Sequence, residues 1–535
     1  MELTDKIYKR FILCAFSGLF TSLIMAIPQI GVFEWLSLIP AALVLYIACS
    51  EKKANYFEIF GHGVFFFLPF YLVVTNWFLY MYPLDFIYGM SPATALMIVL
   101  LAWIGVSVAQ ALAGGLIFML IAFLFRTAPL KRLPLLRPLA AACVWVVYEW
   151  VQTWDWWGMP NCRLANGQTK ILLGIQTASL LGSYLVTFIL VAVNFWFAYA
   201  VMAMRSDEDE KKGRKIKLSS LLAAIMLVFN YGTGAVLWLV NSPNKSNESV
   251  KVAAIQANIP MSGVSNLERR NAYREHTLAA AADGAEVVVW AETAFPSNVE
   301  NENVREFISE LAQEANVMIL AGVFTYDEED RTYNSLVCFT PDGEMHETVY
   351  RKRHLVPFGE FVPLKSFINT FIPALADLAT LGSDMTPGKG TNVIKTDKGN
   401  IGASICYDAV YEDITLDGVG DGAEYFCISS NDAWFDDSVF LTFHNSQASL
   451  RSVEVGRYSV HSANTGISTV IDHRGEIHSE LSPLTEGRVS GNVELRNNRT
   501  LYSYVGNILV YASVAAVAIL IVWQLVYAIV KRKKA

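Results

Sequence analysis

The feature that most constrains this 535-residue chain is a series of apolar runs, each long enough to cross a membrane. A helix needs about 20 mostly apolar residues to span roughly 30 Å of lipid tails. Hydrophobic residues make up 53% of the chain and charged residues only 17%, whereas soluble domains carry about 25% charged residues. The sequence therefore predicts a polytopic α-helical membrane protein.

Eight such runs are present, seven in the first half of the chain and one at its end. They lie at 11–27, 30–49, 57–80, 93–125, 134–152, 172–203, 218–240 and 506–530. The residues between the seventh and eighth runs are polar and mixed in charge. We expect a membrane domain at 1–240, an inserted soluble domain at 241–505, and a C-terminal helix with a basic tail at 506–535.

Lys and Arg residues gather in alternate loops, and this pattern predicts the orientation of the spans, because short cytoplasmic loops are enriched in these residues. They precede the first run, follow the second, fourth and sixth, and form the tail: Lys6, Lys9, Arg10, Lys52, Lys53, Arg126, Lys131, Arg132, Lys211, Lys212, Arg214, Lys215, Lys217 and 531–534. Eight crossings place all of these segments on one side. We therefore expect both termini in the cytoplasm and residues 241–505 outside it.

The soluble region alternates between short apolar strands and helical patterns, which predicts a layered α/β domain. Strands are expected at 251–256, 286–290, 317–323, 334–339, 400–406, 424–429 and 467–472, and helices at 266–282, 302–315 and 441–458. Near-continuous apolar strands are typical of sheets covered by helices. Reactive side chains are expected in the loops that follow such strands.

Three segments of this region place a carboxylate, an amine and a thiol at strand ends or in loops. Glu292 follows Val-Val-Val-Trp-Ala, Lys352 lies in Tyr-Arg-Lys-Arg-His, and Cys406 follows Ile-Gly-Ala-Ser-Ile. A cation lowers the pKa of a nearby thiol, a carboxylate can accept its proton, and a lysine can stabilise an oxyanion. Taken singly, the three have structural alternatives: a buried thiol, a turn-capping carboxylate and a solvated base.

Taken together, the three segments resemble the signature segments of the nitrilase superfamily, in the same order. They are Trp-Ala-Glu-Thr-Ala-Phe-Pro at 290–296, Lys-Arg-His-Leu-Val-Pro-Phe-Gly-Glu at 352–360 and Ile-Cys-Tyr-Asp at 405–408. The run at 355–364, Ser-Asn-Asp-Ala-Trp-Phe at 430–435 and the eight-span frame resemble the apolipoprotein N-acyltransferase family within that superfamily. The resemblance implies an α-β-β-α sandwich with a Glu-Lys-Cys triad.

The resemblance also implies roles for individual residues. Glu292 matches the general base, Lys352 the oxyanion-stabilising lysine, Cys406 the nucleophile and Glu360 a second glutamate that supports the triad. The further candidates for substrate binding or support are Tyr407, Asp408, Phe358, Trp434, Phe367 and Phe371. Two positions depart from the family pattern, since Asp408 stands where Glu is usual and Asp436 where Gly commonly follows Ala-Trp-Phe.

The reaction that the resemblance implies is a two-step acyl transfer without a metal or nucleotide cofactor. A phospholipid, in this family usually phosphatidylethanolamine, gives its sn-1 acyl chain to Cys406, and the α-amine of a diacylglyceryl cysteine at a lipoprotein N-terminus then takes it. The expected setting is a bacterial inner membrane with the soluble domain in the periplasm.

A net charge of −8 argues against a nucleic-acid partner. The sequence shows neither a glycine-rich phosphate loop nor a close histidine pair suited to zinc.

Segment 361–381 is unusually apolar for a soluble loop. This composition predicts membrane contact or a lid over an acyl-binding pocket, with the core of an ordinary helix as the alternative. The ionisable residues considered beside the spans, namely His62, Asp85, Glu149 and Asp155, lie at or near predicted span ends, so no ion pathway is expected.

Two other functions fit parts of the sequence. A membrane-tethered amidase would use the same triad with water as the acceptor. A transporter or receptor with a degenerate outer domain would carry polar groups deep in its spans and an incomplete triad, and the sequence favours neither feature.

Overall fold

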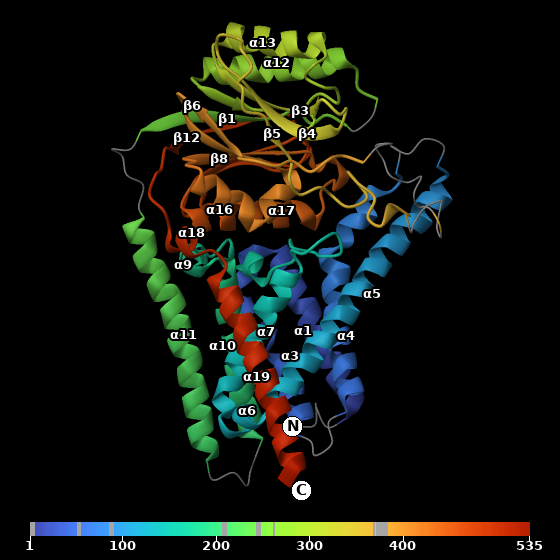
Figure 1. The fold of residues 1–535 in the computed structure, drawn as a ribbon, viewed down its shortest axis with the longest axis vertical. Helices are drawn as coiled ribbons and strands as arrows, with labels where there is room; N and C mark the ends of the chain where they lie inside the picture. Colours follow the sequence, from blue (N-terminus) through green and yellow to red (C-terminus); the bar gives the residue numbers. More distant parts are fainter. Residues whose placement is uncertain are drawn as a thin grey trace.

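The computed structural model describes residues 6–50, 55–84, 90–205, 211–241, 248–260, 263–366, 370 and 384–534. Long helices form one end of the molecule and a layered α/β domain forms the other (Figure 1). The predicted fold class, a polytopic helical protein with an inserted α/β sandwich, is confirmed.

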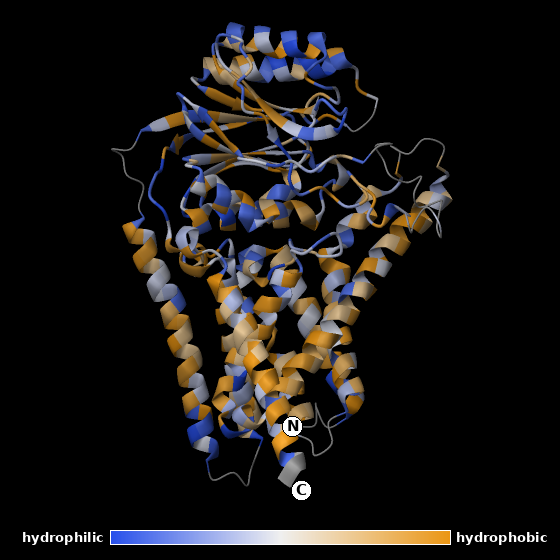
Figure 2. Ribbon diagram, viewed as in Figure 1, coloured by the Kyte–Doolittle hydropathy of each residue, from blue (hydrophilic) through white to orange (hydrophobic). Residues whose placement is uncertain are grey.

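Eight helical segments of the described chain are long and apolar enough to cross a membrane: Ile7–Ala26, Pro28–Ser50, Tyr56–Met81, Pro92–Phe125, Pro134–Val151, Ser183–Met204, Lys212–Val240 and Ile508–Lys531. Figure 2 shows predominantly hydrophobic residues along these helices. Large apolar side chains are exposed on their surfaces, among them Leu101, Val228 and Ile519. Such surfaces suit contact with lipid tails.

The helices of this end, in chain order, are α1 (Ile7–Ala26), η2 (Pro28–Phe33), α2 (Glu34–Ser37), α3 (Ile39–Ser50), α4 (Tyr56–Val74), η3 (Asn76–Met81), α5 (Pro92–Phe125), α6 (Ala128–Arg132), η4 (Pro134–Leu136), α7 (Arg137–Val151), η5 (Leu164–Gln168), α8 (Leu172–Ile175), α9 (Ala178–Leu181), α10 (Ser183–Met204), α11 (Lys212–Val240), α18 (Leu501–Val505) and α19 (Ile508–Lys534). The start of α1, the end of α19 and the basic helix α6 all lie at the end of the bundle away from the α/β domain (Figure 1).

The sixth apolar run is not one helix, as the sequence predicted for 172–203. Gly182 has φ +79 and separates the short helices α8 and α9 from α10, which begins at Ser183. A side chain is strained at such a φ, and a Cβ there would lie 2.7 Å from the ring of Tyr502. The break lets the chain turn at the junction with the α/β domain before it enters the bundle.

Glu34 lies within a span and was not among the ionisable residues considered from the sequence. Glu34 is buried in the second span and accepts a hydrogen bond from Gln168 Nε2 at 2.8 Å. Glu149 is also buried, and it accepts from Leu164 N at 2.9 Å and Thr187 Oγ1 at 2.8 Å. Both carboxylates therefore hold loop and helix segments together. Asp85 lies outside the described residues.

The α/β domain contains two six-stranded sheets, in the orders β12-β1-β2-β3-β4-β5 and β11-β10-β9-β8-β7-β6. The strands are β1 (Ser249–Gln256), β2 (Val287–Val289), β3 (Met318–Tyr326), β4 (Thr332–Phe339), β5 (Tyr350–Arg351), β6 (Val393–Thr396), β7 (Gly399–Ile405), β8 (Tyr425–Ser430), β9 (Tyr458–Ala463), β10 (Ser468–Ile471), β11 (Ile477–Leu481) and β12 (Gly487–Glu494). The central strands β1, β2 and β3 are parallel, as are β7, β8 and β9. Apolar side chains of both sheets form one shared core.

Helices cover both outer faces of the sandwich. α12 (Asn266–Ala282) and α13 (Glu302–Ala315) cover the first sheet, and α16 (Glu412–Gly420) and α17 (Val439–Val455) cover the second, between it and the membrane helices (Figure 1). Two short helices, η6 (Cys406–Val410) and η7 (Asp432–Trp434), follow β7 and β8. The α-β-β-α sandwich that the resemblance implied is therefore present.

The helix predicted at 441–458 ends three residues early. Gly456 adopts a left-handed conformation with φ 66 and caps α17, and the chain continues directly into β9. The sequence also missed β5, β6, β9, β11, β12 and α16. β5 and β6 are only two and four residues long, and β11 is only partly buried, so neither length nor an apolar run marked them.

A buried charge network joins the α/β domain to the membrane helices. Arg163, before η5, pairs with Glu412 of α16, and Arg451 of α17 donates to Glu454 at 2.8 Å. Glu454 also accepts from the backbone N of Ser183, at the start of α10, at 2.6 Å. Burial acts to raise the pKa of Glu412, but Arg163 and Arg451 outweigh it and lower this pKa to about 2. The domains are therefore joined by the Arg163–Glu412 ion pair and by the hydrogen bond from Ser183 N to Glu454.

Replacing Arg163 with Ala should destabilise the protein strongly, because it leaves the buried Glu412 carboxylate with only the longer ion pair to Arg451, at 3.8 Å. Breaking one side of a buried ion pair costs roughly 3–5 kcal/mol. The matched control is Arg274→Ala, which removes an exposed pair with Glu314 and should cost less than about 1 kcal/mol. Thermal unfolding in detergent measures both changes, and equal shifts of Tm would contradict this reading of the junction.

Candidate active site

Glu292 lies just beyond β2, on a segment that β1 and β3 hold by parallel pairing. The residue is 6% exposed. The described groups that form hydrogen bonds with its carboxylate are all donors. Oε1 accepts from Lys352 Nζ at 2.8 Å and from Asn334 Nδ2 at 2.7 Å, and Oε2 accepts from the backbone N of Asn431 at 2.8 Å. The carboxylate is therefore fixed in orientation.

Lys352 lies directly after β5 and is 1% exposed. Its ammonium group lies between two carboxylates, 2.8 Å from Glu292 Oε1 and 3.0 Å from Glu360 Oε2. Burial alone would lower the pKa of Lys352, but Glu292 and Glu360 outweigh it and raise this pKa well above its ordinary value. Lys352 is therefore a permanent buried cation.

Cys406 is the first residue after β7 and has φ 48, in the left-handed region. Non-glycine residues held there are strained, and such strain is common at functional sites. Burial raises the pKa of the Cys406 thiol well above its usual range, with Glu292 adding to the rise and Lys352 opposing it. The resting thiol is therefore protonated, beside a carboxylate that can accept the proton and a cation that can stabilise negative charge.

Asn334 of β4 connects the two carboxylates, and it was not among the residues predicted from the sequence. Its Nδ2 donates at 2.7 Å to both Glu292 Oε1 and Glu360 Oε1. Its backbone carbonyl oxygen accepts from the backbone N of Lys352 at 2.8 Å. Glu360 Oε2 also accepts from Val356 N at 2.8 Å. The signal that could have revealed Asn334 is a buried amide side chain in a strand that continues as the apolar run 336–339.

Asp408 joins the lysine segment to the cysteine segment. Its Oδ2 accepts from Tyr350 Oη at 2.7 Å and from Ile405 N at 3.2 Å, and its Oδ1 accepts from His354 N at 2.8 Å. Tyr350 and His354 lie on either side of Lys352 in sequence. Asp408, whose side chain is shorter than the Glu usual in the family, therefore fixes the segment that carries Lys352 relative to the segment that carries Cys406.

The remaining candidates are spread more widely. Tyr407 packs edge-on against Tyr411 with ring centroids 5.2 Å apart, whereas Phe358 is 43% exposed. Trp434 packs in an apolar cluster that includes Trp77 of η3. Phe367 and Phe371, like most of the apolar segment predicted to contact the membrane, lie outside the described residues.

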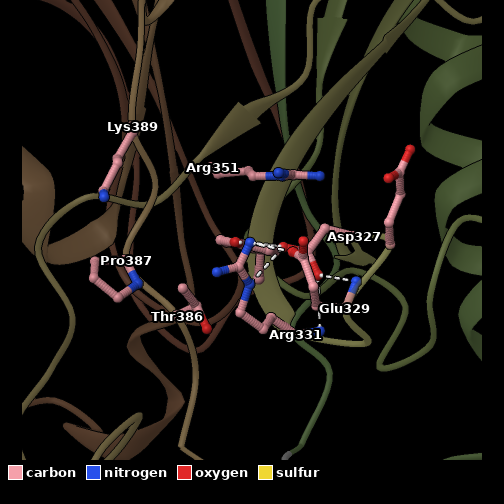
Figure 3. A pocket seen from close by; sticks show the side chains of 9 residues that line it. Asp327, Glu329, Arg331, Arg351, Thr386, Pro387 and Lys389 are labelled. Carbon is pink, nitrogen blue, oxygen red and sulfur yellow. Dashed lines mark hydrogen bonds and ion pairs between the residues drawn. The ribbon is translucent and has the colours of Figure 1, made fainter.

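Two cavities adjoin the site. One, of about 490 Å³, reaches from Tyr407 to the membrane-side loop and is lined by Thr153, Asp155, Trp156, Arg353, His354, Leu355, Pro357, Phe361, Asp384, Met385, Pro387, Tyr407 and Tyr411. The other, of about 380 Å³, is polar and lies beside Arg351 (Figure 3). Pro387 lines both cavities, so they are neighbours. The first is lined both by Tyr407, which follows Cys406, and by residues of the loop after α7.

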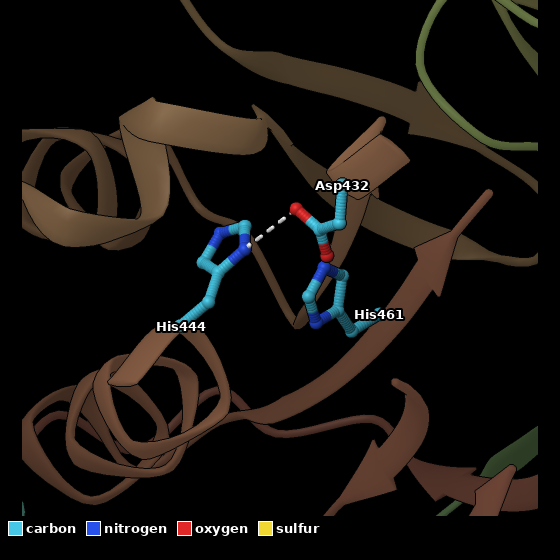
Figure 4. Close-up of side chains that lie close together, drawn as sticks. All are labelled: Asp432, His444 and His461. Carbon is cyan, nitrogen blue, oxygen red and sulfur yellow. Dashed lines mark hydrogen bonds and ion pairs between the residues drawn. The ribbon is translucent and has the colours of Figure 1, made fainter. Parts of the chain in front are cut away.

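Asp432, His444 and His461 form a cluster (Figure 4), and His444 Nε2 lies 3.1 Å from the carbonyl oxygen of Cys406. The sequence had indicated no close histidine pair, but the structure places the rings of His444 and His461 4.8 Å apart. The ligand atoms of the three residues lie within 4.8 Å of one another, close enough for a metal ion. The two histidines are 17 positions apart on different elements, so no short-range spacing could have revealed them.

Two family models match this chain, and between them they cover most of it. The apolipoprotein N-acyltransferase N-terminal domain matches residues 17–196, and the carbon-nitrogen hydrolase model matches residues 251–501. An apolipoprotein N-acyltransferase of Gloeobacter violaceus is 29% identical over 94% of this chain and 91% of its own, and one of Geobacter metallireducens is 27% identical over 96% and 95%. The chain belongs to the apolipoprotein N-acyltransferase family.

Solved structures of nitrilase-superfamily proteins resemble about half of this family member. Saccharomyces cerevisiae Nit3 is 18% identical with a TM-score of 0.37 and covers 49% of this chain and 96% of its own. An amidase from Nesterenkonia sp. is 13% identical with a TM-score of 0.37 and covers 49% of this chain and 95% of its own.

In this apolipoprotein N-acyltransferase family member, Asp408→Ala should reduce both stability and turnover. The substitution leaves three buried donors without an acceptor, and each such group costs roughly 1–3 kcal/mol. Asp408→Asn keeps one side-chain acceptor and should be milder on both counts. Thermal unfolding and acyl-transfer assays on the purified variants check this, and an Asp408→Ala protein as stable as Asp408→Asn would contradict it.

Proposed function

We propose that this protein transfers an acyl chain from a phospholipid to the α-amine of the N-terminal diacylglyceryl cysteine of lipoproteins, with Cys406 carrying the chain as a thioester. The observation that carries the proposal is the buried site in which Lys352 Nζ lies 2.8 Å from Glu292 beside the thiol of Cys406. The family membership of the chain supports lipoprotein acylation, because its relatives are named apolipoprotein N-acyltransferases.

The first half-reaction forms the thioester. Glu292 accepts the thiol proton of Cys406, and the thiolate attacks the ester carbonyl of the donor. The ammonium group of Lys352 stabilises the oxyanion of the tetrahedral intermediate. When the intermediate collapses, the ester C–O bond breaks, and the lysophospholipid alkoxide leaves with the proton from Glu292.

The second half-reaction transfers the chain to the amine. The neutral α-amine of the lipoprotein attacks the thioester carbonyl, Glu292 accepts the amine proton, and the C–S bond breaks. The proton then returns to the Cys406 thiolate, which restores the resting thiol. Glu360 and Asn334 take no part in bond making, but their hydrogen bonds keep Lys352 and Glu292 in place.

The surroundings of the site suit lipid substrates. The cavity beside Tyr407 is lined by Trp156 of the loop after α7, and Trp154 and Trp157 of the same loop are exposed. Tryptophan is enriched at the lipid–water interface. We propose phosphatidylethanolamine as the donor, and the apolar segment 361–381 as the arm that admits it.

The positions of the basic residues support one orientation of the helices in the membrane. The basic residues of α6 and of the start of α11 lie at the end of the bundle away from the α/β domain (Figure 1). Because cytoplasmic loops are enriched in Lys and Arg, this arrangement supports a cytoplasmic location for that end. We propose an inner-membrane protein with a membrane domain at 1–240, a periplasmic catalytic domain at 241–505, and a C-terminal span and tail at 506–535.

Incubation of the purified protein with phosphatidylethanolamine should add the mass of one acyl chain. Intact-mass spectrometry should show this adduct on the native protein and on Cys427→Ser, which changes another buried free thiol of the same domain. Cys406→Ser should show no hydroxylamine-labile adduct, because an acylated serine would be an ester of far lower reactivity.

The acceptor step has its own readout. Adding a diacylglyceryl lipopeptide with a free α-amine should discharge the adduct and yield an N-acylated peptide. Release of free fatty acid without the peptide product would favour the amidase-type hydrolysis instead. A native protein that stays folded but acquires no adduct from any phospholipid would contradict the acyl-enzyme mechanism.

A further inference from the structure

Helix α17 contacts the membrane helices with one set of side chains and the nucleophile with another. On the membrane side, Ser446 Oγ lies 3.0 Å from Thr169 Oγ1, and Gln447 Nε2 donates to Asn166 Oδ1 at 2.8 Å. The same helix also carries His444, whose Nε2 lies 3.1 Å from the carbonyl oxygen of Cys406. The same helix therefore connects the membrane bundle to the backbone of the proposed nucleophile.

The partners of His444 determine its charge. Its Nδ1 lies 3.3 Å from Asp432 Oδ1, and its Nε2 faces the Cys406 carbonyl, so each ring nitrogen faces a group that only accepts hydrogen bonds. A neutral imidazole has one N–H, whereas an imidazolium has two. Two hydrogen bonds to two acceptors therefore require the imidazolium. Both His444 and Asp432 are at least 98% buried, so water does not screen the pair.

The groups around His444 are consistent with one positive charge there. Burial acts to lower the pKa of His444, but Asp432 outweighs it and raises this pKa, and Glu292 adds to the rise. His461 of β9 has its pKa lowered to about 3, chiefly by burial, and is neutral. On α17 itself, the ring of Phe440 packs at 5.7 Å.

We propose that His444, held by Asp432, is a positioning residue for the nucleophile. It holds the Cys406 carbonyl and so keeps the strained left-handed backbone that aims the thiol, and it places a fixed positive charge behind the thiolate. This inference rests on the proposed role of Cys406 as the acyl-carrying nucleophile. Because His444 lies on α17, the position of the nucleophile is also linked to the contacts that α17 makes with the membrane helices.

Three substitutions separate the hydrogen bond from the charge. His444→Gln keeps an amide donor near the Cys406 carbonyl without the charge, His444→Leu removes both, and Asp432→Asn weakens the support of the imidazolium. His478→Gln is the matched control, because His478 pairs with Asp472 at 3.3 Å in another part of the domain. Thermal unfolding in detergent identifies variants that are folded.

Two measurements report the reactivity of the Cys406 thiol. The first is the pH dependence of Cys406 alkylation by iodoacetamide, located by peptide mapping, which needs no acyl transfer. The second is the single-turnover rate of thioester formation from phosphatidylethanolamine. His444→Leu should slow thioester formation on the order of tenfold to a hundredfold, the range expected for one charge-assisted hydrogen bond. Both His444→Leu and His444→Gln should shift the alkylation profile to higher pH, and His478→Gln should change neither readout.

Two results would overturn the proposal. The first is folded His444→Leu and His444→Gln protein with the native alkylation profile, whatever the turnover, because a purely structural histidine would behave in this way. The second is one equivalent of zinc in the purified native protein that is lost in His461→Asn, since a metal ion would replace the proton on Nδ1. Failure of the native protein to form a thioester would contradict the proposed function, yet the alkylation profile would still test His444.

Discussion

One buried ammonium group between two carboxylates organises the catalytic end of this molecule. Lys352 Nζ contacts Glu292 and Glu360 at 2.8 and 3.0 Å, and the side chain is 1% exposed. A buried charge is tolerated only when it is paired and hydrogen-bonded. Because Glu292 follows β2, Lys352 follows β5 and Glu360 lies in the next loop, this pairing ties three separate segments to one point. Asn334, between the carboxylates, completes the arrangement.

The thiol depends on that arrangement for its chemistry. Cys406 is buried among apolar side chains of both sheets, which disfavours the thiolate. Lys352 opposes this effect, and Glu292 offers a nearby acceptor for the proton. In the proposed mechanism, the thiolate forms when the proton moves to Glu292, whose orientation is fixed by Lys352, Asn334 and the backbone of Asn431.

The sandwich is attached to the membrane bundle through buried polar contacts that a loose tether would not need. Arg163 with Glu412, and Arg451 with Glu454, cross or line this junction, and α17 carries Arg451, Gln447 and His444 on one helix. A rigid junction suits an enzyme whose substrates remain anchored in lipid by their acyl chains. The reacting carbonyl can then meet the thiol at a constant height above the membrane.

Much of this could be predicted because it depends on residues close together in sequence. Apolar runs predict spans whatever their neighbours, and the three signature segments place Glu292, Lys352 and Cys406 at or near strand ends. The errors arose where a single backbone position overrides the pattern: Gly182 interrupts an apolar run of 32 residues, and Gly456 ends α17 early. Short strands such as β5 were missed because two residues carry no periodicity.

The sequence by itself determined the membrane character, the inserted α/β domain and the residue types available for chemistry, because hydrophobic length and strand periodicity are local properties. Only the tertiary structure decided which polar groups meet. Asn334 lies between Glu292 and Glu360, Asp408 joins Tyr350 to Ile405, and His444 meets both Asp432 and the carbonyl oxygen of Cys406. These contacts depend on sheet order and on the packing of α17, and buried polar groups must find their partners across such distances wherever the fold brings them together.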